Sequence, residues 1–379
     1  SNSQIMLRSC SISAMILLVT SIVSADNITD GMINWVRSKG GSFNDKVEIR
    51  RIDPSDESSY FGVFAKEILY EKELIMHIPE TCYIEVWDAA VDMSALEGKE
   101  AVDANHGNLC KLTHELIQEM KLGIKSQFAP YIAYLQTQKP GQLPAQWSEQ
   151  GKNVLRNISF PGSEIVDWID LNFQRTGCIS DDPFEVHVVE MVVQRSFDTA
   201  LIPLWDMVNH DNGRINTEND SIYSEGGIKV RASRPIEAGE EIFASYDTCL
   251  DCFDDENFSG TPEILKDFGF VENYPHRWIF DNNGSTIWFE IWFEIDETHN
   301  GLYVDWDTLE EDAFGVPGRE DILFLQSELE RLRRVGKDFL KEKGSIPQYE
   351  WEMINAFHEA AVLGISMAVE AASEVASAR

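Results

Sequence analysis

The residues best suited to chemistry lie in two short segments of the chain. The first, residues 201–212, reads LIPLWDMVNHDN. It is an apolar stretch followed by Asn209 and His210. The second, Ser245-Tyr246-Asp247, closes a segment with the pattern of a β-strand. A lone histidine or strand tyrosine is usually structural, but the asparagine beside the histidine and the run before it favour a binding role. The first segment is therefore a candidate binding site.

Strands and turns must position these two segments. Residues 60–65 and 73–79 have the composition of two strands joined by a charged turn. A glycine-led acidic turn at residues 238–241 precedes the strand that ends at Tyr246, and Asp267-Phe268-Gly269-Phe270 follows that strand. We therefore expect the candidate residues on short strands and on the turns that connect them.

Helical patterns fill the middle and the end of the chain. Apolar residues recur at helical spacing over residues 109–138, and Pro183 opens another helix that leads toward the first segment. The other predicted elements are a helix at residues 163–173, strand-like runs rich in tryptophan at 274–306, and amphipathic helices at 321–343 and 349–375. The last two helices suggest an antiparallel pair.

Length and charge limit the class of protein. With 379 residues, of which 43% are hydrophobic and 25% charged, the chain can bury a sizeable core and form two or three units. Its 65 acidic and 31 basic residues give a formal net charge of −34, which argues against nucleic acid as a partner. A basic protein or peptide is an easier partner, although a solvated acidic surface also explains this charge.

The N-terminal residues resemble a targeting segment. Arg8 precedes an apolar run at residues 12–23, and Val23-Ser24-Ala25 fits a signal-peptide cleavage site. The run is short for a membrane-spanning helix, so we expect cleavage after Ala25 and no stable membrane span; an uncleaved anchor is the alternative. The predicted location is the secretory pathway or an organelle reached through it, or the cytoplasm if this segment is not a working signal.

Removal of this segment leaves an odd number of cysteines, Cys82, Cys110, Cys178, Cys249 and Cys252. In an oxidising compartment one thiol would then be free or paired with another chain. Cys249 and Cys252 form a CxxC motif, but no second motif stands at metal-ligand spacing, so we expect no metal. The acidic run at residues 251–256 lacks the glycine and spacing of an EF-hand and is interpreted as solvated charge.

Several motifs in a fixed order resemble SET-domain methyltransferases, in the branch that includes the Rubisco large-subunit lysine methyltransferase and the actin-histidine methyltransferase. The resemblance covers residues 31–275. Its motifs are Phe61-Gly62-Val63-Phe64-Ala65, Ser126-Gln127-Phe128-Ala129-Pro130-Tyr131, Arg195-Ser196-Phe197, LIPLWDMVNHDN, Ser245-Tyr246-Asp247 and Phe268-Gly269-Phe270. No single motif suffices, but their order makes coincidence improbable.

The resemblance implies an α+β fold, the SET fold of small β-sheets with a helical insertion, followed by a mainly helical C-terminal domain. The expected parts are a signal peptide or anchor (1–25), the N-terminal part of the SET domain (26–92), the helical insertion (93–175), the C-terminal part of the SET domain (176–275), and a domain similar to substrate-docking domains (276–379).

The resemblance also implies S-adenosyl-L-methionine as cofactor and protein methylation as activity. Methyl transfer is an in-line displacement that needs an aligned neutral nucleophile and exclusion of water, with no metal. Tyr246 is the expected catalytic residue, because its hydroxyl would orient the nucleophile. The residues assigned to the cofactor are Ser59, Tyr60, Phe61, Arg195, Asn209, His210, Phe268, Gly269 and Phe270. Among these, Arg195 would face the cofactor carboxylate.

The substrate is a protein or peptide, and two residues disagree about which side chain is methylated. The expected pocket consists of Phe197, Trp205, Asp206 and Tyr223. Trp205 matches the actin-histidine enzyme, whereas Phe197 matches the lysine enzymes and cannot hydrogen-bond an imidazole. We therefore expect lysine, with histidine as the alternative.

Two departures from the family pattern motivate a different hypothesis. Ser59-Tyr60 replaces the usual Glu-Gly, which puts the close backbone approach to the cofactor in doubt, since tyrosine tolerates positive φ less than glycine. Phe268 replaces a second tyrosine of the lysine enzymes. A SET-fold binding module without methyltransferase activity is therefore the second alternative.

Overall fold

The structure is a computed structural model that describes residues 25–56, 59–86, 98–160, 163–197, 199–222, 224–246, 260–282, 284–295, 300–306 and 317–378. Some predicted features lie outside these residues. They are the signal segment before residue 25, Tyr223, Asp247, the Cys249/Cys252 pair and the acidic run at residues 251–256.

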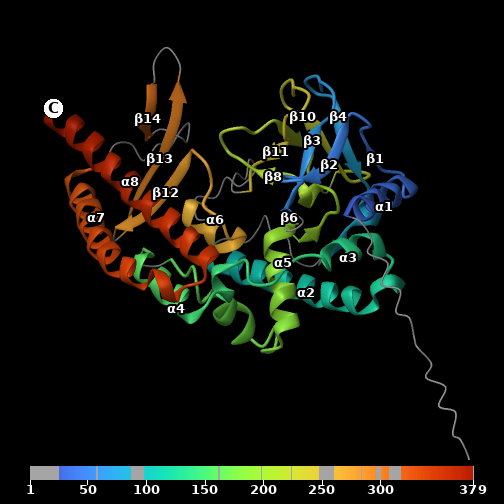
Figure 1. Cartoon of the computed structure of the whole chain (residues 1–379), viewed down its shortest axis with the longest axis horizontal. Coiled ribbons are helices and arrows are strands. Elements are labelled where there is room, and N and C mark those ends of the chain that lie inside the picture. Colours follow the sequence, from blue (N-terminus) through green and yellow to red (C-terminus); the bar gives the residue numbers. More distant parts are fainter. Residues whose placement is uncertain are drawn as a thin grey trace, which may run out of the picture.

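Small sheets form one end of the molecule (Figure 1). In the described residues a four-stranded sheet has the order β1-β4-β10-β9, and a three-stranded sheet has the order β5-β7-β6. Strand β2 pairs with β3, and β8 runs parallel to β11. The bounds are β1 (Ser42–Phe43), β2 (Val47–Arg51), β3 (Phe61–Ala65), β4 (Leu74–Ile78), β5 (Ile84–Glu85), β6 (Ser196–Phe197), β7 (Ala200–Leu201), β8 (Asn209–His210), β9 (Thr217–Asn219), β10 (Ile228–Ala232) and β11 (Phe243–Ala244).

The two strands predicted at residues 60–65 and 73–79 are confirmed as β3 and β4. They belong to different sheets, because β3 pairs with β2 and β4 pairs with β1 and β10. Val63, Ile75 and Met76 have no exposed surface, and their strands contribute to one apolar core that also includes α1 (Ala25–Ser38). Burial of this core fixes the strands that carry the candidate site.

The helical insertion begins with α2 (Gly98–Leu122) and α3 (Ala129–Leu135). The pattern over residues 109–138 is helical as predicted, but the helix is interrupted. Gly123 has a φ of 53°, a left-handed value that glycine adopts without steric cost, and it opens a 3-10 turn. Pro130 then lies in the first turn of α3, where its missing N–H leaves no helical bond unmade.

The helix predicted at residues 163–173 forms only in its second half. Residues 163–167 are not helical, residues 168–174 are, with a π-helix at Asp170–Gln174, and a longer regular helix lies earlier, as α4 (Glu149–Ile158). Ser148 caps α4 by accepting the N–H of Gly151 at 3.1 Å. Ile165 and Phe173 are buried, so their spacing reflects turns packed against neighbouring helices. The third helix, predicted from Pro183, is confirmed as α5 (Pro183–Arg195).

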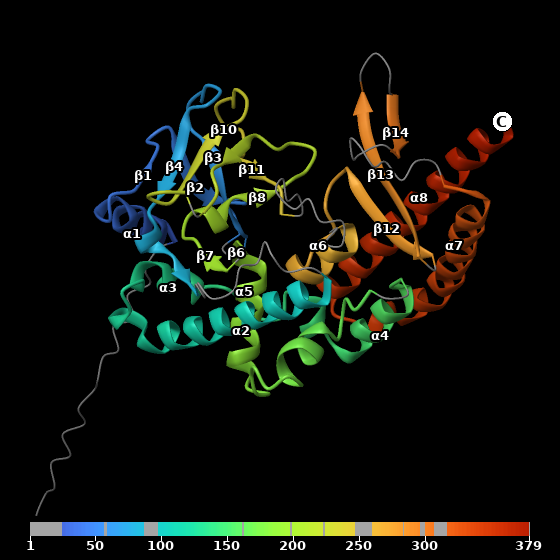
Figure 2. The same ribbon diagram turned by 180° about the vertical axis from the view of Figure 1, so that it is seen from behind.

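The C-terminal part combines a sheet with two long helices (Figure 2). It begins after α6 (Thr261–Phe268) and contains β12 (His276–Asn282), β13 (Ser285–Ile295), β14 (Asn300–Asp305), α7 (Arg319–Phe339) and α8 (Gln348–Ala378). The strands pair in the order β12-β13-β14, and α7 packs against α8, as predicted. Side chains of α4 share the core of this part, so a core crosses from the insertion into the C-terminal residues.

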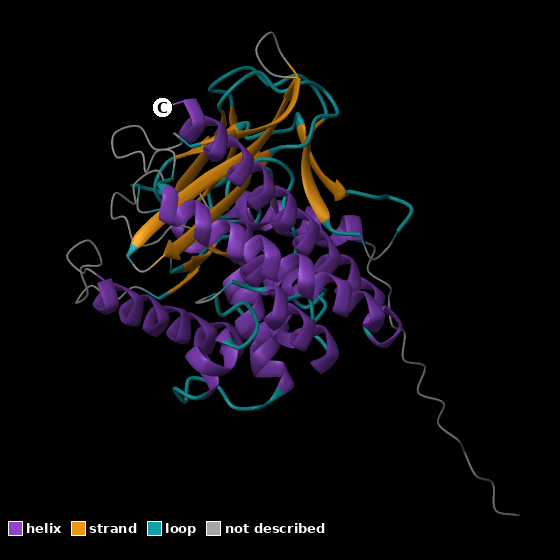
Figure 3. Ribbon diagram, turned by 90° about the vertical axis from the view of Figure 1, so that its left-hand side faces the viewer, coloured by secondary structure: helices purple, strands orange, loops and turns teal. Residues whose placement is uncertain are grey.

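The α+β fold class is confirmed. Most helices gather on one side of the molecule and the strands on the other (Figure 3). Helix α5 packs on α2 of the insertion and ends at Arg195, directly before β6, so α5 delivers that arginine to the strands of the site.

Candidate active site

A cavity of about 490 Å³ lies where the strands, the insertion and the C-terminal helix meet. This volume is within the usual range for small-molecule sites. Eleven of the residues predicted from the sequence line it: Ser59, Tyr60, Phe61, Arg195, Asp206, Asn209, His210, Tyr246, Phe268, Gly269 and Phe270. The tertiary structure thus brings together the residues that the sequence placed in separate motifs.

Tyr246 is fixed at two points. It lies just past β11, whose Ala244 pairs with His210 in the parallel strand β8. The backbone N–H of Tyr246 donates to Nδ1 of His210 at 3.0 Å, and its hydroxyl donates to the carbonyl of Val208 at 2.9 Å. Burial raises the pKa of Tyr246 above its ordinary value, so the phenol stays protonated at neutral pH.

Arg195 and Asp206 form a buried polar cluster at the cavity. Arg195 Nη1 lies 3.4 Å from Asp206 Oδ2, which also accepts the hydroxyl of Tyr131 at 2.8 Å. Arg195 further donates to the hydroxyl of Tyr134 at 3.0 Å and to Gln138 at 2.6 Å. Burial raises the pKa of Asp206 to about 6, against the opposing effect of Arg195.

Two atoms of this cluster lack a partner. Within the described residues, Arg195 Nε and Asp206 Oδ1 are buried and have no hydrogen-bond partner. A buried donor or acceptor without a partner is costly. Neither atom has accessible surface, so a group in the cavity could pair with it only after these side chains move.

Asn209 is engaged within the protein. Its Nδ2 donates to the carbonyl of Phe61 at 3.1 Å and to Oε1 of Glu241 at 2.7 Å, which ties β8 to β3. A Cβ at Gly62 would come within 3.0 Å of this amide nitrogen and would also collide with the Glu241 carboxylate. Gly62 is thus required by close packing behind the cavity, and Asn209 organises that wall.

Tyr60, which stands where the family pattern has glycine, causes no backbone strain. Among the described non-glycine residues, only Lys72 and Leu204 have positive φ. Tyr60 therefore adopts an ordinary conformation, and its side chain is 53% exposed at the rim of the cavity. The doubt raised by the missing glycine concerned a conformation that this loop does not use.

Aromatic rings form one wall. The ring centroids of Tyr246 and Phe268 are 4.6 Å apart, and those of His210 and Phe270 are 6.0 Å apart. Gly269 between them ends α6 with a φ of 81°, and a Cβ there would approach the carbonyl of Gln142 to 2.5 Å. Such aromatic faces attract cations.

Several lining residues were not predicted. Tyr134 and Gln138 come from the insertion, close to the Ser126–Tyr131 motif, which was the available signal for them. Tyr349 and Met353 come from α8, and no sequence motif indicated them. The Tyr349 hydroxyl donates to the carbonyl of Gly269 at 2.8 Å. The C-terminal helix therefore helps to build the site.

Two of the predicted pocket residues lie beside the cavity and are not among those that line it. Phe197 and Trp205 pack edge to face, with ring centroids 6.2 Å apart. Trp205 is a buried core residue immediately before Asp206. Leu204, just before it, has a φ of 69°, a strained value for a non-glycine residue, which turns the chain toward the cavity. The roles predicted for Phe197 and Trp205 stay predictions.

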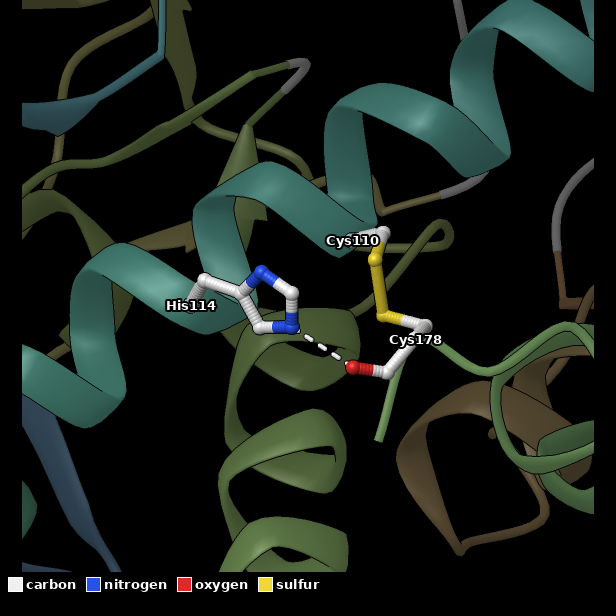
Figure 4. Close-up of side chains that lie close together, drawn as sticks. All are labelled: Cys110, His114 and Cys178. Carbon is white, nitrogen blue, oxygen red and sulfur yellow. Dashed lines mark hydrogen bonds between the residues drawn. A yellow bond between two sulfur atoms is a disulfide. The ribbon is translucent and has the colours of Figure 1, made fainter. Parts of the chain in front are cut away.

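A disulfide joins Cys110 of α2 to Cys178, with Cα atoms 5.8 Å apart, and His114 lies next to it (Figure 4). His114 Nε2 bonds the carbonyl of Cys178 at 2.6 Å. Because the two sulfurs are bonded to each other, neither is a thiolate available to a metal. Cys82 is buried and unpaired among the described cysteines. Within the described residues we find no helix whose length and hydropathy suit a membrane span.

Comparison with known proteins agrees with this geometry. Residues 60–247 match the family model described as SET domain, so the chain is a SET-domain protein. The chain is similar to a crystal structure described as the SET domain of LSMT bound to lysine and AdoHcy, with 13% identity, 93% of this chain and 92% of that chain covered, and a TM-score of 0.52. A structure of Rubisco LSMT bound to sinefungin and monomethyllysine has 13% identity, 92% coverage of each chain and a TM-score of 0.50. A search of curated proteins gave no match.

Proposed function

We propose that this chain is an S-adenosylmethionine-dependent protein methyltransferase that acts on a lysine side chain. The observation that carries the proposal is the cavity of the SET domain, where a buried arginine, a fixed tyrosine and an aromatic wall converge. These groups match the requirements of methyl transfer: a held cofactor, an oriented nucleophile and little water.

The residues present suit the cofactor. A carboxylate entering the cavity would meet the positive charge of Arg195, which lines it, and could form a charge-assisted hydrogen bond with the guanidinium. The faces of Phe268 and Tyr246 suit a positively charged sulfur. When bound, S-adenosylmethionine supplies a methyl carbon made electrophilic by its sulfonium. The AdoHcy and sinefungin in the similar structures support this assignment.

Tyr246 would position the substrate nitrogen. Its hydroxyl hydrogen is committed to Val208, so its oxygen is free to accept an N–H from an amine. Because burial raises its pKa, Tyr246 orients the nucleophile and does not act as a base at neutral pH. The apolar wall would lower the pKa of an entering lysine toward the neutral, nucleophilic form.

Lysine as the methylated residue is supported by the lysine and monomethyllysine in the similar structures. The sequence argument for histidine depended on Trp205, and that for lysine on Phe197. Both lie beside the cavity, and Tyr246 can accept an N–H from either side chain, so Tyr246 does not distinguish the two substrates. The support for lysine therefore comes from the ligands of the similar structures.

Labelled S-adenosylmethionine tests the proposal. The protein from residue 26 onward is incubated with the labelled cofactor and a protein extract, and modified residues are identified by mass spectrometry. We expect methyl-lysine, and strongly reduced labelling with Tyr246→Phe, which should still bind the cofactor. Methyl-histidine would overturn the lysine assignment. Cofactor binding by calorimetry without any label would favour the inactive binding module, and absence of binding would overturn the cofactor assignment.

We also propose that the protein matures in an oxidising compartment, as the signal-like N-terminal segment suggests. The Cys110–Cys178 disulfide supports this location, because such bonds form and persist in the secretory route and are rare in the cytosol. Alkylation of the full chain in cells, before and after reduction, tests it. Cys110 and Cys178 should react only after reduction; their reaction without a reductant would contradict the location.

A further inference from the structure

His210 and Glu272 form a buried pair directly behind Tyr246. His210 Nε2 lies 2.9 Å from Oε2 of Glu272, and their side chains are 0% and 1% exposed. Glu272 does not line the cavity, so it cannot touch a cofactor or substrate there. A carboxylate this deeply buried is stable only when its partners are well placed.

The hydrogen bonds fix the protons of the imidazole. The backbone N–H of Tyr246 can only donate, and it points at Nδ1 of His210 at 3.0 Å. Nδ1 must therefore present a lone pair, and the ring proton resides on Nε2, where it is donated to Glu272. Only one of the two neutral tautomers satisfies both neighbours, and a doubly protonated ring would place two N–H groups against each other.

Glu272 is itself held from the C-terminal side. Its Oε1 accepts the hydroxyl of Thr261, the first residue of α6, at 2.6 Å. Its carbonyl bonds Nε2 of His276 in β12 at 2.9 Å. A continuous set of bonds thus runs from the start of α6 and β12 through Glu272 and His210 to the backbone of Tyr246.

We propose that Glu272 is a positioning residue for methyl transfer, acting through His210 to hold Tyr246. This inference rests on the proposed function of the cavity. Without Glu272, the imidazole could adopt the other tautomer, whose proton on Nδ1 would face the Tyr246 N–H and displace that backbone. The hydroxyl of Tyr246 would then no longer point at the substrate nitrogen, even though its hydrogen bond to the Val208 carbonyl remains possible.

Nitrogen NMR tests the pair without any enzymatic activity. In protein labelled with 15N-histidine, the His210 signals are assigned by their loss in His210→Asn. We expect an unprotonated Nδ1 and a protonated Nε2. A protonated Nδ1 would overturn the proposal whether or not the protein methylates anything, so this result is separate from the fate of the proposed function.

Two substitutions then separate positioning from ionic pairing. Glu272→Leu removes the acceptor and should lower kcat about 10²-fold, the effect expected of a small misplacement, with little change in cofactor Kd or peptide KM. Glu272→Gln keeps a neutral acceptor for the Nε2 proton and should recover most of kcat. Equal losses in both variants would contradict a neutral, tautomer-fixing role.

Glu290 provides a matched control. It is also a buried carboxylate, 2% exposed, whose Oε1 pairs with Arg277 Nε at 2.6 Å, and it lies on β13 outside the cavity. Glu290→Leu should lower thermal stability without the kcat loss of Glu272→Leu. If Glu272→Leu does not fold, the NMR result for His210 and the kcat of Glu272→Gln still test the positioning role. Wild-type kcat in a folded Glu272→Leu variant would refute the inference, whereas an inactive wild type would refute the proposed function instead.

Discussion

The titration of Asp206 tests the electrostatics of the site most directly. Asp206 is held between Arg195, which favours its charged form, and burial, which disfavours it. The structure indicates that burial prevails and raises the pKa of Asp206 from 3.8 to about 6. The folded state therefore binds this proton more tightly than the unfolded state, so the associated stability is present below the unfolded pKa and is lost as the pH rises through about 6.

The size of the effect follows from the shift. Each pKa unit corresponds to about 1.4 kcal/mol, so the full loss above pH 6 is about 3 kcal/mol. Of this, about 2 kcal/mol falls between about pH 4.5 and about pH 7.5, because the unfolded carboxyl is already mostly ionised at the lower pH. Asp206→Asn cannot titrate and lacks this contribution.

Urea unfolding at the two pH values measures it. The unfolding free energy of the wild type minus that of Asp206→Asn should fall by about 2 kcal/mol from the lower to the higher pH, while other titrating groups cancel. Asp167→Asn is the control that should not respond, because its hydrogen bond to Arg156 lowers the pKa of Asp167 below its ordinary value. Asp167 is then largely ionised in both states at the two pH values, so that difference should stay nearly constant.

A constant difference for Asp206→Asn, or one that rises with pH, would refute the reasoning. A constant difference would mean that the pKa of Asp206 is not raised, because an unshifted or lowered pKa leaves this carboxyl largely ionised in both states over this range. The attraction of Arg195 would then equal or exceed the cost of burial, and the cavity would hold an ionised carboxylate.

Three further predictions concern the walls of the site and its scaffold. Gly62→Ala should weaken cofactor binding by about 1–3 kcal/mol, since its Cβ meets the Asn209 amide; unchanged calorimetric affinity would contradict this close packing. Tyr349→Phe removes the bond to the Gly269 carbonyl and should cost about 1 kcal/mol of cofactor affinity, again by calorimetry, whereas full affinity would assign α8 no part in the site. Replacing Cys110 and Cys178 by serine should lower the unfolding free energy by about 4 kcal/mol, given the separation of 68 residues; unchanged urea unfolding would contradict the bond.

The motifs predicted which residues meet more accurately than they predicted the elements around them. Asn209, Tyr246 and Phe268 were identified from local sequence, because each stands in a short pattern whose order is characteristic. The helix expected at residues 163–173 begins only at residue 168, because helical spacing of apolar residues also arises from successive buried turns.

The roles of individual side chains depended on the tertiary structure. Sequence reasoning assigned Asn209 to the cofactor, which stays a prediction, and only the structure shows that its amide nitrogen bonds Phe61 and Glu241. Glu272 follows two residues after Phe270, yet nothing in that spacing shows that its carboxylate reaches His210. Contacts of this kind join residues far apart in the chain, and short patterns carry no information about them.

The sequence by itself determined the fold class, the site motifs and the presence of a cavity-forming tyrosine, since these depend on local patterns and their order. The tertiary structure decided which polar atoms remain without partners, that α8 closes the site with Tyr349, and that Phe197 and Trp205 pack together beside the cavity. The physical reason is that burial and hydrogen-bond partners are set by the whole packed chain, so the protons and charges of the site exist only once the cores have formed.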